Sequence, residues 1–279
     1  MYILAFSILQ RGRAGSFLTS SQTKIRAKHY NKSPLKSILW SGLDKISLPV
    51  SIMRRLLTAI TLSLLANFAI SQKLSQVTIS AGTTFSYFSF VTDQGILLRV
   101  TDDGKLSEWG TELLSDRGNY YDPKLQPYLG RIEYYGQEAD SAFRGKVRSI
   151  GTCNLTYYGH LDEVTRVGKL KSIGTLLLDY YSNFDNAAYK GKLRFIGSSV
   201  IEYYSSVDDE AYRGKLKSIG GNSITWYSTF DDKLLKGKLK RVGAVPFEWY
   251  SSFDKTELRG ALKSGLYRQT IGGVTYILR

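Results

Sequence analysis

One phrase recurs six times between Gly145 and Gly265. It reads GKVRSIG from Gly145, GKLKSIG from Gly168, GKLRFIG from Gly191, GKLKSIG from Gly214, GKLKRVG from Gly237 and GALKSG from Gly260. Successive first glycines are always 23 residues apart. A fixed period of this length indicates a repeat architecture, in which each unit buries its apolar side against its neighbours.

A second phrase lies between the copies and alternates apolar and polar residues, which is typical of a half-buried strand. It appears as LTYYGHLD, LLDYYSNFD, IEYYSSVD, ITWYSTFD and FEWYSSFD. In the second of these, one face carries Leu178, Tyr180, Ser182 and Phe184, and the other carries Asp179 and Tyr181. In the fourth, Ile224, Trp226, Ser228 and Phe230 share the first face. We expect that first face to point into the core.

The glycine phrase is too short for a helix, and it places Leu170 and Ile173 three residues apart. That spacing predicts a strand with a bulge or a sharp twist near its end. An aspartate recurs six residues before each glycine, at Asp162, Asp185, Asp208, Asp231 and Asp254. We expect these carboxylates to cap their own turns as Asx turns, in preference to binding calcium, because one carboxylate per turn is few for six to eight oxygen ligands.

The lysines favour a meander over a solenoid. In a solenoid, equivalent lysines would stack about 5 Å apart and repel by about 3 kcal/mol per pair at an effective dielectric near 20. In a meander, a strand with Asp179, Glu202 or Glu248 lies between them and offers cross-strand partners. The sequence therefore predicts an all-β fold, an antiparallel meander of tandem 23-residue hairpins in an elongated, curled sheet. A closed β-barrel is the alternative.

The chain divides into five parts. Residues 1–52 hold eight Lys or Arg and one acid, and we expect a disordered extension that is either absent from the native protein, with Met53 as initiator, or a targeting segment. Residues 53–71 resemble a secretory signal peptide, with a membrane anchor as the alternative. We expect an N-terminal β cap over 72–131, the repeats over 132–265, and a C-terminal β-hairpin cap over 266–279.

Charge argues against a nucleic-acid partner. Residues 1–71 hold ten of the 38 Lys and Arg and one of the 24 acids, so residues 72–279 carry 28 basic residues against 23 acids. The net charge of that part is about +5 rather than the +14 of the whole chain. Most of the basic excess therefore lies in the part that we expect to be removed.

Few residues are of the kind that catalysis or metal binding needs. Cys153 is the only cysteine, and we expect it to be buried in the core. His160 is the only histidine after residue 71, and we expect it on the surface. A catalytic triad or a His-rich metal site needs more than these. We therefore predict no enzymatic activity, no cofactor and no metal.

Two periodic rows are candidate ligand-binding residues. The first contains Tyr158, Tyr181, Tyr204, Tyr227 and Tyr250, which we expect on the outward face. The second, a basic row, contains Lys169, Lys192, Lys215 and Lys238. Aromatic rings beside polar residues would suit an extended polysaccharide, and the basic row an acidic polymer. The plainer alternative is that the tyrosines pack on neighbouring lysine stems.

The repeat resembles MORN-type proteins, whose 23-residue units are glycine- and tyrosine-rich β-hairpins laid side by side. The resemblance covers about 132–265 and rests on the period, on tyrosine pairs such as Tyr203-Tyr204, and on Gly214-Lys215-Leu216. It implies a scaffold or surface-binding role without catalysis. We expect an exported protein, periplasmic, cell-surface or extracellular, with a structural or protein-interaction role at the cell envelope. A polysaccharide-binding module is the alternative, and association with a membrane surface is a further expectation.

Overall fold

A computed structural model describes residues 72–113 and 124–279. The extension over 1–52 and the signal peptide over 53–71 lie outside the described residues, so both stay predictions. In the part of the chain that the structure describes, no helix is long and apolar enough to cross a membrane.

The described residues form strands and one short 3₁₀ helix. The strands before the repeats are β1 Lys73–Ser80, β2 Thr84–Val91, β3 Leu97–Val100, β4 Leu106–Glu112 and β5 Leu125–Pro127. The repeats contain β6 Ile132–Tyr134, β7 Val147–Ile150, β8 Cys153–Tyr157, β9 Leu170–Ile173, β10 Leu176–Tyr180, β11 Leu193–Ile196, β12 Ser199–Tyr203, β13 Leu216–Ile219, β14 Asn222–Trp226, β15 Leu239–Val242 and β16 Val245–Pro246. The chain continues through β17 Glu248–Trp249, η2 Thr256–Leu258, β18 Leu262–Ser264, β19 Arg268–Ile271 and β20 Val274–Leu278.

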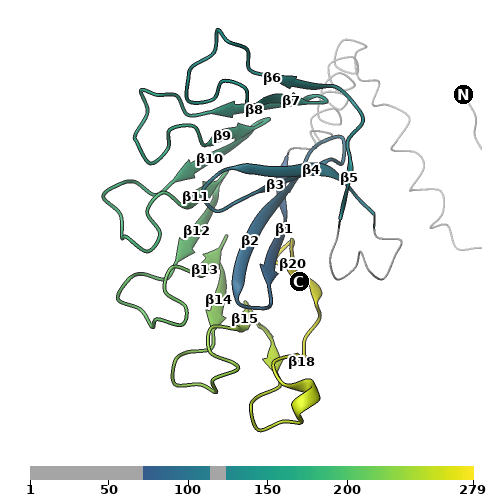
Figure 1. The fold of residues 1–279 in the computed structure, drawn as a ribbon, viewed down its shortest axis with the longest axis vertical. Helices are drawn as coiled ribbons and strands as arrows, with labels where there is room; N and C mark the ends of the chain where they lie inside the picture. Colours follow the sequence, from purple (N-terminus) through teal and green to yellow (C-terminus); the bar gives the residue numbers. More distant parts are fainter. Residues whose placement is uncertain (1–71, 114–123) are drawn as a thin grey trace, which may run out of the picture. The chain divides into compact units, whose positions relative to one another are not determined.

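The repeats form the predicted antiparallel meander. Strands β6 to β16 make one sheet of 11 strands in which sequence neighbours are also spatial neighbours. The sheet curls through the molecule with its strands fanned, and a long loop leaves each repeat on one side (Figure 1). Strands β6 and β16 are its two ends and do not pair with each other, so the closed-barrel alternative is wrong. Strands β17 and β18 pair separately and complete the array.

Each repeat contains the predicted bulge. In the pairing of β8 with β9, Thr156 lies opposite Ser172 and Tyr157 lies opposite Leu170, so Lys171 is the extra residue. The same shift recurs where β10 meets β11, where β12 meets β13 and where β14 meets β15. The extra residue lets both Leu170 and Ile173 face the core although they are three residues apart.

A second sheet is built from both ends of the described chain. Its order is β19-β20-β1-β2-β3-β4-β5, and β1 pairs with β20 in parallel while the other pairs are antiparallel. The predicted C-terminal hairpin is present, with its turn at Gly272-Gly273. It pairs with β1, however, and does not extend the repeat sheet. Because β20 pairs with β1, the strand β1 has a neighbour on each side and its edge is covered.

The second sheet packs over the repeat sheet along its length. One core cluster includes Phe88, Phe90 and Leu98 from the second sheet together with Leu170, Leu193 and Leu239 from the repeats. The backbone N–H groups of these three repeat leucines donate to carbonyls of the second sheet's turns, at Gly104 (3.2 Å), Asp102 (2.7 Å) and Gly82 (2.7 Å) respectively. The N-terminal part therefore covers a face of the array.

Gly104 shows how closely the two sheets approach. Its φ is 81°, and a Cβ at this position would lie 2.3 Å from the Tyr180 hydroxyl. A side chain there would push the turn off the repeat sheet, so glycine is needed for both reasons. Cys153 lies in the same core and is buried as predicted.

Candidate functional site

The tyrosine row is part of the repeat packing. Its hydroxyl groups donate to backbone carbonyls 20 residues later, from Tyr158 to Leu178 (2.9 Å), from Tyr181 to Ile201 (2.9 Å), from Tyr204 to Ile224 (3.0 Å) and from Tyr227 to Phe247 (3.3 Å). Tyr158 is buried and the other four rings are half-buried. The expectation of an exposed row is therefore wrong, because the hydroxyl of each of the first four rings reaches a carbonyl of the next hairpin and every ring of the row is at least half-buried.

A second basic residue covers each ring of that row. The side chain of the bulge residue lies 5.0 to 5.9 Å from the ring centroid, at Lys171 over Tyr158, Arg194 over Tyr181, Lys217 over Tyr204, Lys240 over Tyr227 and Lys263 over Tyr250. Burial raises the pKa of Tyr158, Tyr181, Tyr204 and Tyr227. The plainer alternative, rings packed on basic side chains, describes this arrangement.

The basic row is also engaged inside the protein. The Nζ atoms of Lys169, Lys192 and Lys215 donate to the carbonyls of Gly191, Gly214 and Gly237, and that of Lys238 donates to Ala81. The same Nζ atoms lie over Tyr180 (5.0 Å), Tyr203 (5.1 Å), Trp226 (4.9 Å) and Trp249 (4.2 Å). Burial lowers the pKa of Lys215 to about 8. These lysines join one repeat to the next and are poorly placed for an acidic polymer.

Two of the expected cross-strand acid partners of the lysines, Asp179 and Glu202, are used otherwise. Asp179 lies 3.1 Å from the Arg166 guanidinium, and Glu202 accepts a hydrogen bond from Ser218 (2.7 Å).

The aspartate row caps its turns, as the sequence predicts. Asp231 Oδ2 accepts hydrogen bonds from the backbone N–H of Ser228 (2.6 Å) and from its hydroxyl (2.9 Å), while the Asp231 N–H donates to the Ser228 carbonyl (3.3 Å). Asp185, Asp208 and Asp254 repeat this closed turn, and Asp162 does so with Gly159. The carboxylate accepts from the backbone N–H three residues earlier, whereas in an Asx turn the side chain accepts from an N–H two residues later. The caps are therefore not Asx turns.

A second periodic position ties each turn to the next one. Asp209 accepts from the N–H of Ala211 (2.8 Å) in its own loop and from the N–H of Thr229 (3.0 Å) in the following repeat. Asp140, Asn186 and Asp232 do the same, and Glu163 accepts from Asn183. The amides of Ala142 and His160 lower the pKa of Asp140 to about 2. His160 itself is exposed, as predicted, with Nδ1 2.6 Å from Asp140.

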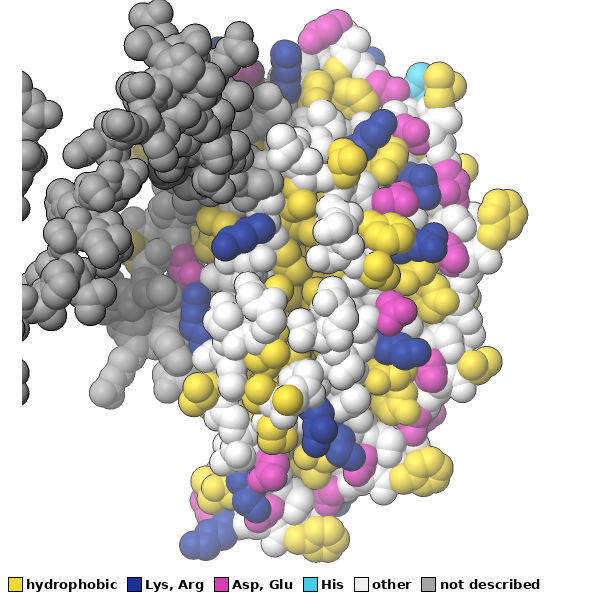
Figure 2. All heavy atoms as spheres, turned by 180° about the vertical axis from the view of Figure 1, so that it is seen from behind, with side chains coloured by type: hydrophobic (Ala, Val, Ile, Leu, Met, Phe, Trp, Pro, Cys, Tyr) yellow, Lys and Arg dark blue, Asp and Glu magenta, His cyan; other side chains and the backbone are white. Residues whose placement is uncertain are grey.

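These turns display a row of bare apolar side chains, which we call the tip row. It consists of Leu161, Phe184, Val207, Phe230 and Phe253, with exposed fractions of 91, 94, 90, 95 and 93%. Figure 2 shows apolar side chains standing out singly along this edge, separated by charged and other polar groups. The expectation that Phe184 and Phe230 face the core is wrong, because the strand ends at Tyr180 or Trp226 and the chain then turns.

The backbone beneath each phenylalanine of the tip row is held by internal hydrogen bonds. In the Phe230 turn, Ser228 N–H donates to Asp231, Thr229 N–H to Asp209, Phe230 N–H to the Ser228 hydroxyl (3.2 Å), and Asp231 N–H to the Ser228 carbonyl. The Phe184 and Phe253 turns have the same four bonds. The three phenylalanines of the tip row are therefore presented by turns whose amide groups are already bonded within the protein.

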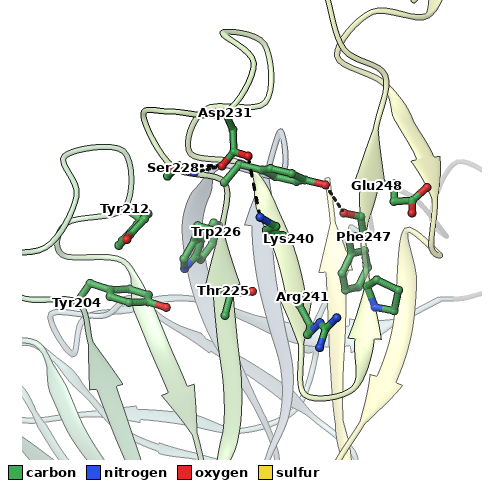
Figure 3. A pocket seen from close by; sticks show the side chains of 12 residues that line it. Tyr204, Tyr212, Thr225, Trp226, Ser228, Asp231, Lys240, Arg241, Phe247 and Glu248 are labelled. Carbon is green, nitrogen blue, oxygen red and sulfur yellow. Dashed lines mark hydrogen bonds and ion pairs between the residues drawn. The ribbon is translucent and has the colours of Figure 1, made fainter.

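A groove of about 560 Å³ lies on the outward face near the end of the array (Figure 3). Tyr204 and Tyr227 from the tyrosine row line it, with Lys240, Arg241 and Glu248 around them. The Tyr227 hydroxyl donates to the carbonyl of Phe247, which also lines the groove. In this groove, two tyrosines of the predicted ligand-binding row lie beside the exposed charged side chains of Lys240, Arg241 and Glu248.

Comparisons with protein families, with curated proteins and with solved structures found no match for the chain. The resemblance to MORN-type repeats stays a prediction from the sequence, and functional inference depends on the geometry described above.

Proposed function

We propose that this chain is a non-enzymatic interaction protein that presents its tip row to a macromolecular partner at the cell envelope. The observation that carries the proposal is the near-complete exposure of five apolar side chains at one repeat position. Single exposed apolar residues are ordinary on protein surfaces, but here one turn position is apolar and exposed in five successive repeats, and we take that recurrence as the mark of a binding surface.

Energetics support this role. Burying a Phe, Leu or Val side chain stabilises a protein or a complex by about 1.5–3 kcal/mol. The tip-row side chains are exposed, so this stabilisation would be gained only when a partner covers them. Because the turns are already held by Asp231, Asp209 and their equivalents, binding would not have to order the loops. The row therefore offers preorganised apolar anchors.

The place of action is proposed from sequence. Residues 53–71 have the basic start, apolar middle and small residues of a signal peptide. Export would bring the repeats to the periplasm, the cell surface or the extracellular space, where a rigid scaffold meets envelope components.

Photo-crosslinking in the producing cell tests the proposal. A photoreactive phenylalanine analogue is placed at Phe184, Phe230 or Phe253, and at Leu129, which is equally exposed but lies outside the tip row. We expect one discrete protein adduct from the three row positions and none from Leu129. Equal labelling at all four positions, or no adduct, would contradict the proposal.

The groove in Figure 3 favours a second candidate, binding of a polysaccharide. The groove's three tyrosines and the exposed Lys240 and Arg241 offer ring edges and donors to a hydroxyl- or carboxylate-bearing sugar. In polysaccharide-containing native gels, the full chain should be retarded and the Lys240→Ala/Arg241→Ala variant should be retarded at least threefold less. Equal mobility of the two proteins in every polysaccharide tested would remove this candidate.

A further inference from the structure

We infer that the partner of the tip row is an amphipathic helix with an apolar residue every seven positions and Lys or Arg beside that stripe. This inference rests on the proposed function and specifies the chemistry of the protein that would cover the row. Three features of the repeats point to it: their stride, the gaps between the tips, and the charge of the turns.

The stride of the repeats is close to that of a helical heptad. Each repeat advances the sheet by two strands, which is about 9.6 Å at the usual spacing of 4.8 Å. Seven residues of α-helix advance about 10.5 Å. Figure 1 shows the loops of successive repeats leaving the sheet on the outer side of its fan. A β-strand presents the same face about every 6.6 Å and does not match.

The tips are single protrusions, and the gaps between them suit helix side chains. Phe184, Val207 and Phe230 occupy the same position in successive repeats, and each side chain is at least 90% exposed. Figure 2 shows exposed apolar side chains separated by charged and other polar groups. A helix lying along the row would place one apolar side chain per heptad into each gap, while each tip enters the hole between four helix residues. This is the knobs-into-holes geometry of coiled coils, with the tips as one set of knobs.

The turns carry more acids than bases. An aspartate follows every residue of the tip row directly, and the five loops 159–167, 182–190, 205–213, 228–236 and 251–259 contain ten acids and seven basic residues. Asp208, Asp209 and Glu210 crowd the central turn. A partner with Lys or Arg beside its apolar stripe complements this edge.

The same charges disfavour two other occupants. A second copy meeting the row about a two-fold axis would bring the acidic central turns together. An anionic lipid surface would be repelled by the excess of carboxylates. Both occupants are included as outcomes in the experiment.

The test uses 28-residue helical peptides with Leu at every seventh position, Ala at the other seam position and Lys on either side. Matched peptides carry Glu in place of Lys, or a four-residue insertion that breaks the stride. Fluorescence anisotropy measures their binding to the full chain, to the Phe184→Ser/Phe230→Ser/Phe253→Ser variant and to the control Leu129→Ser.

We expect the Lys peptide to bind the wild-type chain and the Leu129→Ser control equally, and to bind the triple variant at least tenfold more weakly. The Glu peptide and the interrupted peptide should also bind at least tenfold more weakly than the Lys peptide. If the triple variant does not fold, as judged by circular dichroism, single Phe230→Ser should still weaken binding about threefold.

Four results would overturn the inference: no binding of the Lys peptide, equal binding of the Lys and Glu peptides, co-sedimentation of the chain with phospholipid vesicles that depends on the tip row, or dimerisation that depends on it. The two peptide results leave the crosslinking experiment unaffected, whereas tip-dependent dimerisation would give a self-adduct in it and tip-dependent vesicle binding would give no protein adduct. A tip-specific protein adduct without peptide binding would overturn the helix and leave the proposed interaction role in place.

Discussion

Trp226 and Phe230 lie four residues apart in one repeat, and their surroundings are opposite. Trp226 is buried in β14, its indole N–H donates to the Leu216 carbonyl (2.7 Å), and Lys215 lies over its ring. Phe230 is 95% exposed on a turn and packs against nothing. Both residues are aromatic and both fit the same period-two alternation, yet only one contributes to folding.

This difference shows where the apolar–polar alternation no longer predicts which face of the sheet a side chain lies on. It predicts a face only while the backbone stays extended, and in every repeat the strand ends at the inner aromatic residue. Beyond it, the Ser-x-Phe-Asp turn points the next large side chain to solvent. Repetition of that side chain is then a sign of display on the surface and no longer of a core.

The largest effect should come from truncating the inner member of the pair. Trp226→Ala removes a buried indole and leaves the Leu216 carbonyl without its indole donor. We expect it to lower the free energy of unfolding by about 3–5 kcal/mol. Phe230→Ala should change it by less than about 0.5 kcal/mol. Urea denaturation of both variants checks the contrast, and a cost above about 1 kcal/mol for Phe230→Ala would mean that the tip is packed after all.

A smaller effect is expected where the loop returns to the sheet. Gly237 has φ 74°, and a Cβ there would lie 2.8 Å from the Ala211 carbonyl, whereas Gly260 has φ 76° and open space around that position. Gly260→Ala should cost about 1 kcal/mol from backbone strain alone, and Gly237→Ala about 2 kcal/mol or more. Thermal unfolding of the two variants measures the difference, and equal costs would show that the contact with Ala211 relaxes freely.

Removing a turn cap should have a smaller effect again. Asp231→Ala deletes the acceptor of the Ser228 N–H and hydroxyl, and we expect a loss of about 1 kcal/mol, as for helix caps. Amide exchange at Ser228 should accelerate, while exchange within β14 should not. Asp231→Asn keeps one acceptor oxygen, so its stability should lie between those of the wild type and Asp231→Ala. Faster amide exchange throughout the sheet would instead show that the turn is part of the core folding unit.

The mildest perturbation is pH. Amides of Ala142 and His160 hold the pKa of Asp140 at about 2, below its ordinary 3.8, and the Ser205 and Ser251 hydroxyl and amide groups lower the pKa of Asp208 and Asp254. A lowered pKa in the folded state stabilises the fold above the ordinary value, and this contribution is lost as the pH falls toward the folded value. The protection of the His160 amide, its exchange rate relative to the intrinsic rate at the same pH, should therefore fall between about pH 4 and pH 2. Asp140→Asn should abolish that pH dependence, and an unchanged profile would show that the carboxylate does not hold the turn.

Much of the repeat could be predicted from the sequence because the relevant forces are local. The glycine spacing gave the unit, the spacing of Leu170 and Ile173 gave the bulge, and the lysine charges excluded direct stacking in favour of the meander. The turn aspartates were also predictable, since their partners lie three residues away.

The rest depends on contacts that are distant in the sequence. The cover of the array by the second sheet uses hydrogen bonds from Leu170 to Gly104 and from Leu239 to Gly82, which no local pattern indicates. The hydroxyl groups of the tyrosine row donate to backbone carbonyls of the next repeat, 20 residues later in the sequence. The tip row was visible as a 23-residue periodicity at Leu161, Phe184, Val207, Phe230 and Phe253, but hydrophobicity alone assigned it to the wrong side.

The parallel pairing of β1 with β20 has a consequence for how such a protein can evolve. Open-ended arrays gain and lose units freely, because each unit touches only its neighbours. Here the first and last strands of the described residues pair with each other in a sheet that packs over the array, so one added or deleted unit would shift the two strands out of register. The copy number is thus fixed by the ends, and the length of the displayed row with it.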